Sequence, residues 1–110
     1  MAIDISHLLP DMLDAAKGVI GDKWPDAKDY ATSEFKKIGK NIADIEALRL
    51  EGKITDEQAR MHLEIQKNAS QMVLLTVQGL GLLMAEQAIN AALGVLKDFV
   101  NGVLGFALIR

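Results

Sequence analysis

The stretch TDEQARMHLEIQKNASQMVLLTVQGLGLLMAEQAINAALGVLKDFVNGVLGFALI, residues 55–109, decides how this chain folds. It contains no Pro, and as one continuous helix it would extend roughly 80 Å at about 1.5 Å per residue. Of the 27 Asp, Glu, Lys and Arg residues in the chain, 23 lie before residue 70. The last third of the chain therefore predicts a segment that is mostly covered by other protein surfaces.

The bulk composition favours helices. A chain of 110 residues is long enough for one domain with an ordinary core. Half of the residues are apolar but only 5% are aromatic, whereas strands are usually enriched in aromatic and β-branched residues. The sequence predicts one all-α domain, a helical bundle.

Charge and cysteine content narrow the function classes. A net charge of −3 is too small to indicate a polyanionic partner, and the absence of Cys excludes disulfides and thiolate chemistry. The first ten residues contain no Lys or Arg, so no secretory leader is predicted. A cytoplasmic location follows by default, with the inner membrane as the alternative.

Two helices are expected before the deciding stretch. The first covers about residues 7–20, where apolar residues recur at spacings of three and four. Ser6 is predicted to cap it, Pro10 is tolerated in its first turn, and Gly21 is predicted to end it. The second covers about residues 25–51, with Pro25 at a first helical position.

The sequence LEGKITDEQ, residues 50–58, predicts a tight connection into the third helix. Gly52 suits the left-handed position that ends a helix. Thr55 and Gln58 have the spacing of a capping box, in which each side chain bonds the other residue's backbone N–H. So short a loop predicts an antiparallel hairpin of the second and third helices.

The second helix is too short to cover all of residues 56–109. At about 100° per residue, the apolar arc of residues 81–109 is too wide for one neighbour. Part of this arc is a ridge of small residues, and the rest is a bulky stripe beside it. We predict that both form a subunit interface, composed of Gly81, Ala85, Ala88, Ala92, Leu82, Ile89, Leu93, Leu96 and Val100.

Three arrangements would cover this arc. The chain could break around Gly79-Leu80-Gly81 and fold back, it could continue as one helix against another subunit, or its far half could lie in lipid. Each Gly in a helix interior costs only about 1 kcal/mol relative to Ala, and no Pro, Ser, Asp or Asn follows the pair. We therefore expect a continuous or merely bent helix over residues 56–109, completed by oligomerisation.

No residues form a recognisable catalytic, cofactor-binding or metal-binding set. His7 and Asp11 are spaced i,i+4, which more often reflects a helix-end contact than a metal site, and His62 has no carboxylate at that spacing. The chain also lacks the short motifs of serine hydrolases, zinc peptidases and phosphate-binding loops. We predict a protein that is not an enzyme and needs no cofactor.

The one basic cluster is interleaved with carboxylates. Lys36, Lys37 and Lys40 alternate with Glu34 and Asp44, which is typical of a solvated helix face. We predict no nucleic-acid partner. The function predicted is that of a structural or protein-interaction bundle that self-associates through residues 70–109. The alternatives are a small membrane-associated or pore-forming protein and a bundle that binds an apolar ligand.

Overall fold

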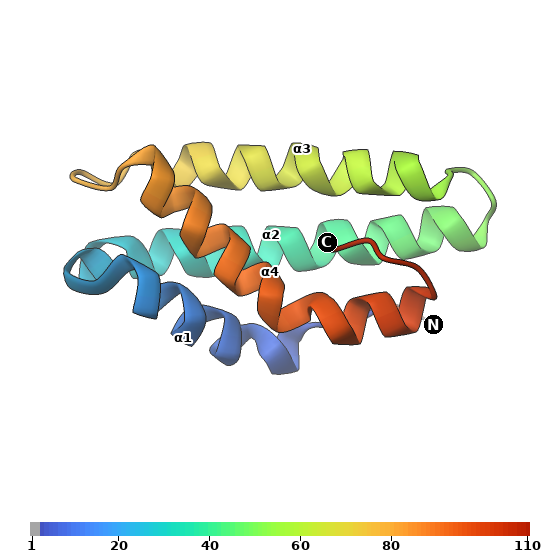
Figure 1. The fold of residues 1–110 in the computed structure, drawn as a ribbon, viewed down its shortest axis with the longest axis horizontal. Coiled ribbons are helices and arrows are strands. Elements are labelled where there is room, and N and C mark those ends of the chain that lie inside the picture. The colour runs from blue at the N-terminus through green and yellow to red at the C-terminus, as the bar shows by residue number, and fades with distance from the viewer. Residues whose placement is uncertain (1–2) are drawn as a thin grey trace.

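The computed structural model describes residues 3–110, which form an elongated bundle measuring 43 × 23 × 20 Å (Figure 1). No strand occurs in this part of the chain, so the all-α prediction is confirmed. Its elements are the 3-10 turns η1 (Ser6–Leu8) and η2 (Gly21–Lys23) and the helices α1 (Leu9–Ile20), α2 (Trp24–Leu50), α3 (Asp56–Leu74) and α4 (Leu82–Leu104).

The start of the first helical segment differs from the prediction. Ser6 is the first residue of η1 and does not cap it with its side chain. Instead, the Ser6 backbone N–H donates to Oδ1 of Asp4 at 2.9 Å. This hydrogen bond lowers the pKa of the Asp4 carboxyl, and the nearby His7 adds to the effect. Further along, Pro10 lies in the first turn of α1 as predicted.

The two predicted helix ends before residue 55 are confirmed. Gly21 follows α1 with φ +63°, and Gly52 follows α2 with φ +70°, both in the region that favours glycine. After Gly52, the Lys53 backbone N–H donates to the Leu48 carbonyl at 2.9 Å. This bond satisfies one of the carbonyls that the last turn of a helix leaves free.

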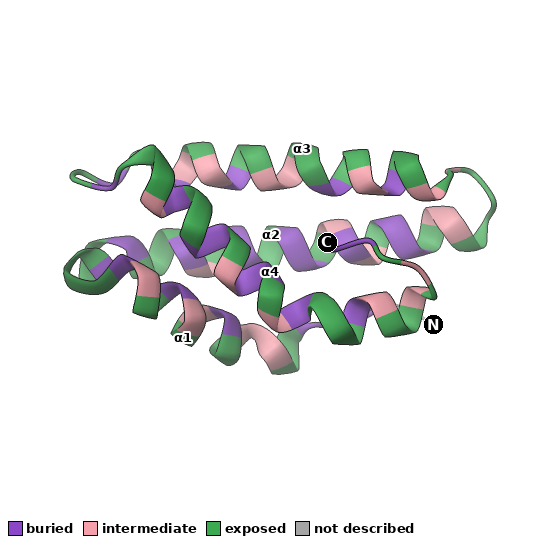
Figure 2. Cartoon of the chain, in the orientation of Figure 1, coloured by how far each residue is buried: buried purple, intermediate pink, exposed green. Residues whose placement is uncertain are grey.

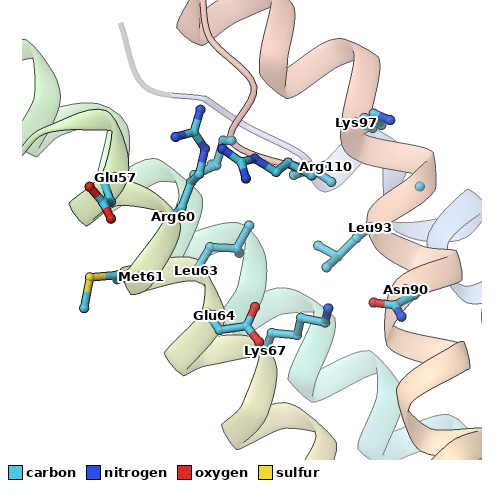
Figure 3. Close-up of a pocket in the computed structure, with 13 residues that line it drawn as sticks. Glu57, Arg60, Met61, Leu63, Glu64, Lys67, Asn90, Leu93, Lys97 and Arg110 are labelled. Carbon is cyan, nitrogen blue, oxygen red and sulfur yellow. The ribbon is translucent and has the colours of Figure 1, made fainter.

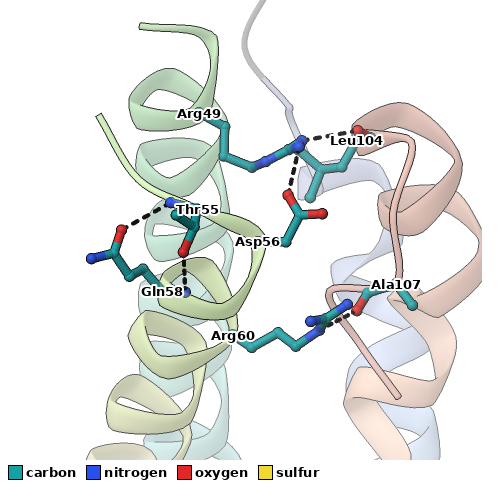
Figure 4. Close-up of polar contacts among 7 residues, drawn as sticks. All are labelled: Arg49, Thr55, Asp56, Gln58, Arg60, Leu104 and Ala107. Carbon is teal, nitrogen blue, oxygen red and sulfur yellow. Dashed lines mark hydrogen bonds and ion pairs between the residues drawn. The ribbon is translucent and has the colours of Figure 1, made fainter. Parts of the chain in front are cut away.

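The capping box at the start of α3 is also confirmed. The Gln58 backbone N–H donates to Oγ1 of Thr55 at 3.1 Å, and the Thr55 backbone N–H donates to Oε1 of Gln58 at 2.9 Å (Figure 4). Residues 51–55 join α2 and α3, which lie side by side (Figure 1). The buried stripe of α2 faces the centre of the bundle (Figure 2) and includes Ala27, Ala31, Phe35, Ile38, Ile42 and Ile45.

The prediction of one long C-terminal helix is wrong. α3 ends at Leu74, α4 begins at Leu82, and the seven residues between them fold the chain back. Gly79 has φ +85°, and Gly81 is extended at φ −81° and ψ 166° as the residue before α4. α4 also ends at Leu104, not at 109, because Gly105 takes a left-handed φ of +77°.

Burial explains why the helix breaks. The fold-back packs α4 mainly against α1, and it buries seven apolar residues of α4 to 5% exposure or less: Ala85, Ala88, Ile89, Ala92, Leu93, Leu96 and Val100. A buried Leu, Ile or Val side chain contributes about 1.5–3 kcal/mol, so the set contributes on the order of 10 kcal/mol. Keeping residues 75–81 helical would stabilise the protein by less than this burial does.

The connection itself also adds to the core. Val77 and Leu80 are each 5% exposed, so residues 75–81 anchor the reversal with two apolar side chains. Backbone bonds of 3.1 Å from Val77 N–H to Leu74 O and from Leu80 N–H to Val77 O keep the segment tightly coiled. Within residues 3–110, no helix combines the length and the apolar character that crossing a membrane requires.

If the chain folds back, replacing each of the two glycines of this connection with Ala should have a different effect on stability. Gly79→Ala should destabilise the protein by about 1–2 kcal/mol, because an L-residue is strained at φ +85°. Gly81→Ala should change stability little, because its φ is ordinary and nothing lies within 4 Å of an added Cβ. Urea denaturation of both variants measures the difference. In a continuous helix both substitutions would instead stabilise by about 1 kcal/mol, and that result would contradict the fold-back.

Candidate functional site

The residues predicted to form a subunit interface lie mostly inside the chain's own core. Seven of the nine are buried in the layer that α4 forms chiefly with α1. Only Gly81 and Leu82 are exposed, and the Leu82 side chain is 58% exposed. The wide apolar arc from which an oligomer was predicted is therefore mostly covered within one chain, although Leu82, Leu83 and Val103 remain more than half exposed.

The largest exposed apolar side chains of α3 fall in one line. Met61, Ile65 and Met72 are 58%, 68% and 66% exposed. At about 100° per residue they lie within roughly 40° of one another around the helix. The exposed positions between Ile65 and Met72 on this side, Asn68 and Ala69, carry no charge. We call these five residues the outer face of α3.

A second feature of α3 is a cleft of about 640 Å³ that it forms with α4 and the last residues of the chain (Figure 3). Leu63 of α3 and Leu93 of α4 face each other across it. Leu108 and Ile109 of the C-terminal segment also line it. All four of these side chains are 6% exposed or less. The cleft therefore has an apolar floor.

Charged side chains surround this floor. The cleft lining includes four cations, Arg60, Lys67, Lys97 and Arg110, and two carboxylates, Glu57 and Glu64. None of the three ion pairs formed within residues 3–110 involves any of these six side chains. In a chain with a net charge of −3, the lining is a local region of excess positive charge.

The wall beside the cleft is held by Arg49 of α2 (Figure 4). Its guanidinium pairs with Asp56 of α3 at 2.7 Å and donates to the carbonyl of Leu104 at 3.1 Å. The same guanidinium lies 4.2 Å from the ring centroid of Phe106. One side chain thus joins α2, the start of α3, the end of α4 and the C-terminal segment.

The rest of the C-terminal segment is fixed by two further side chains. Nε of Arg60 donates to the carbonyl of Ala107 at 2.8 Å (Figure 4). The amide of Asn101 bonds both backbone groups of Ile109, accepting at 3.0 Å and donating at 2.8 Å. Residues 105–109 therefore return along the bundle and close one side of the space in which α4 diverges from α3.

The other sequence candidates are not brought together into a site. The His7 ring packs edge-on against Phe99, with centroids 5.3 Å apart, and His62 is exposed on α3. Among residues 3–110, no three His, Asp or Glu side chains are grouped so as to hold a metal ion. Lys37 pairs with the carboxylate of Glu34 at 2.9 Å. The prediction that Glu34 lies on a solvated helix face is wrong, because this side chain is buried in α2.

The sequence interpretation missed both the cleft and the C-terminal segment. One signal was present: Gly105 followed by the apolar run FALI is the pattern of a helix that ends and returns to the core. The bonds of Arg49 and Arg60 to the end of the chain had no such signal, because the carbonyls that they bind lie 55 and 47 residues away. Comparison with protein-family models, with curated proteins and with solved structures found no match to this chain.

We predict that Arg49→Met destabilises the protein by about 1–2 kcal/mol. The variant keeps a side chain of similar length but loses an ion pair, a hydrogen bond and a cation–π contact. The Arg49 side chain that makes these contacts is only partly exposed, so solvent weakens them less than it would on an open surface. Urea denaturation measures the loss, and hydrogen exchange of residues 105–109 should rise with it.

Lys53→Met is the matched control for Arg49→Met. Its ion pair with Glu51 has both side chains more than half exposed, so its removal should change stability by less than about 0.5 kcal/mol. Equal effects of the two substitutions, or unchanged exchange at residues 105–109, would contradict the role given to Arg49.

Proposed function

We propose that this chain is a non-enzymatic helical bundle that self-associates through the outer face of α3. The observation that carries this proposal is the exposure of Met61, Ile65 and Met72 in one line on a helix whose other side packs against α2. Apolar side chains exposed singly are normal on protein surfaces, whereas several aligned on one helix face favour an interaction site.

The position of these side chains suits a second copy of the same chain. Met61 and Met72 are equidistant from the middle of the outer face, and Asn68 and Ala69 near that middle are small and uncharged. If two α3 helices pack antiparallel about a two-fold axis, Met61 of one meets Met72 of the other. The small central residues allow the helices to approach closely, and Met adapts readily to an irregular surface.

The proposed surface replaces the one predicted from the sequence. Self-association through residues 70–109 was expected because the apolar arc of that region needed covering, and α1 covers most of it. Of the five residues of the outer face, only Met72 lies within residues 70–109. A pairing through α3 would leave α4 and its contact with α1 unchanged.

A non-enzymatic role is consistent with the placement of the groups that could do chemistry. His7 packs against an aromatic ring, and His62 lies on a different helix. Within residues 3–110 neither histidine side chain forms a hydrogen bond to another protein group, so neither is oriented by a third group as a general base usually is.

Ile65→Lys tests the proposal, because it places a charge in the middle of the outer face. Sedimentation equilibrium in buffer without detergent should give about twice the 12.0 kDa chain mass for the unmodified protein. The variant should dissociate at least tenfold more readily, a change of about 1.4 kcal/mol.

The control is Gln87→Lys, which adds the same charge at an exposed position of α4. It should leave the association unchanged. A monomer at all concentrations up to the millimolar range would overturn the proposal, as would an equal effect of the two substitutions.

A further inference from the structure

We infer that the cleft between α3 and α4 binds a single-chain anionic amphiphile, a molecule with one carboxylate head and an unbranched hydrocarbon chain. A free fatty acid has this chemistry. The inference stands apart from the proposed self-association, because the cleft and the outer face of α3 are different sides of the same helix and share only Met61.

The size and floor of the cleft fit the hydrocarbon part. A volume of about 640 Å³ lies within the range of roughly 300–1,000 Å³ that small-molecule sites occupy. The chain of the ligand would lie between Leu63 and Leu93, which face each other across the cleft (Figure 3). Both leucines belong to the continuous core, so the floor is rigidly supported from below.

The charges of the lining fit the head. Lys97 lies on the α4 wall with its amine turned away from Arg110 in Figure 3, so it is not placed to share a head group with it. The guanidinium groups of Arg60 and Arg110 lie near each other at one end of the cleft, beyond the facing leucines. Neither has a carboxylate partner within residues 3–110. A carboxylate placed there would gain charge-assisted hydrogen bonds from these two side chains, while its hydrocarbon chain ran along the apolar floor.

The same lining argues against an extended polyanion. Glu57 and Glu64 lie along the α3 side of the cleft and would repel a second negative group placed beside them. Four cations against two carboxylates favour a ligand of small negative charge. One head group therefore matches the excess of positive charge better than a nucleic-acid strand or an acidic peptide would.

The C-terminal wall makes the site preformed. Leu108 and Ile109 are held in place by the two hydrogen bonds between Asn101 and the backbone of Ile109. A site that already exists before binding loses less affinity to the ordering of loops. The ligand would not need to displace the segment that closes this side of the cleft.

Gly94 offers a way to close the cleft without disturbing the fold. It lines the cleft from the middle of α4, and nothing lies within 4 Å of a Cβ built on it. Gly94→Glu would therefore project a negatively charged side chain at this wall, and the change from Gly should favour the helix. Gly102→Glu is the matched control, because Gly102 is also exposed in α4 with open space around it and does not line the cleft.

The experiment is calorimetric titration of the full chain with dodecanoate below its micelle concentration. We expect saturable one-site binding, at least tenfold weaker for Gly94→Glu and within twofold of the unmodified protein for Gly102→Glu. Acetate, which has the head without the chain, and dodecyltrimethylammonium, which has the chain with a positive head, should each bind at least tenfold more weakly than dodecanoate. Thermal melts of both variants report whether they fold.

Several outcomes would overturn the inference. They are equal binding of dodecanoate and dodecyltrimethylammonium, equal losses in the two glycine variants, and no binding of dodecanoate by the folded protein. Binding only to vesicles of phosphatidylglycerol would also overturn it, since that result indicates a membrane surface as the partner. Ile65→Lys should bind dodecanoate normally, because Ile65 does not line the cleft, so this result is independent of self-association.

Discussion

The packing of α4 against α1 is the contact on which the rest of the structure depends. It joins the two ends of the chain and buries the apolar arc that α2 and α3 do not cover. It also requires the chain to reverse between Leu74 and Leu82, where Gly79 supplies a backbone conformation that other residues adopt only with strain. A single chain can therefore close its core only because the helix is broken between α3 and α4.

The cleft and the exposed outer face of α3 both follow from this packing. Because α4 leaves the end of α3 and runs towards α1 (Figure 1), it contacts α3 only sparsely. The space that opens between the two helices becomes the cleft, which the returning C-terminal segment closes on one side and Arg49 and Arg60 hold. Among residues 3–110, no element covers the outer side of α3, and there Met61, Ile65 and Met72 remain exposed.

Local signals in the sequence predicted local structure well. The ends of the first two helices, the place of Pro10 and the capping box of Thr55 and Gln58 all follow from backbone conformation or hydrogen bonds within a few residues. The break near Gly79 could not be predicted by the same reasoning. Two glycines destabilise a helix only slightly. The fold-back is favoured over an unbroken helix because α4 buries its apolar side chains against α1, about sixty residues earlier in the chain. We expected the apolar arc of residues 81–109 to need covering, but the sequence did not identify α1 as the element that buries most of it.

The most direct test of this account is a distance between α3 and α4 within one chain. The protein has no Cys, so Glu64→Cys and Lys97→Cys allow two specific spin labels at positions that line the same cleft. Dilution with unlabelled chain removes distances between copies in a double electron–electron resonance measurement. The account predicts a separation below about 25 Å, as for labels on helices packed side by side. A separation of roughly 50 Å, the length of 33 residues of unbroken helix, would contradict it.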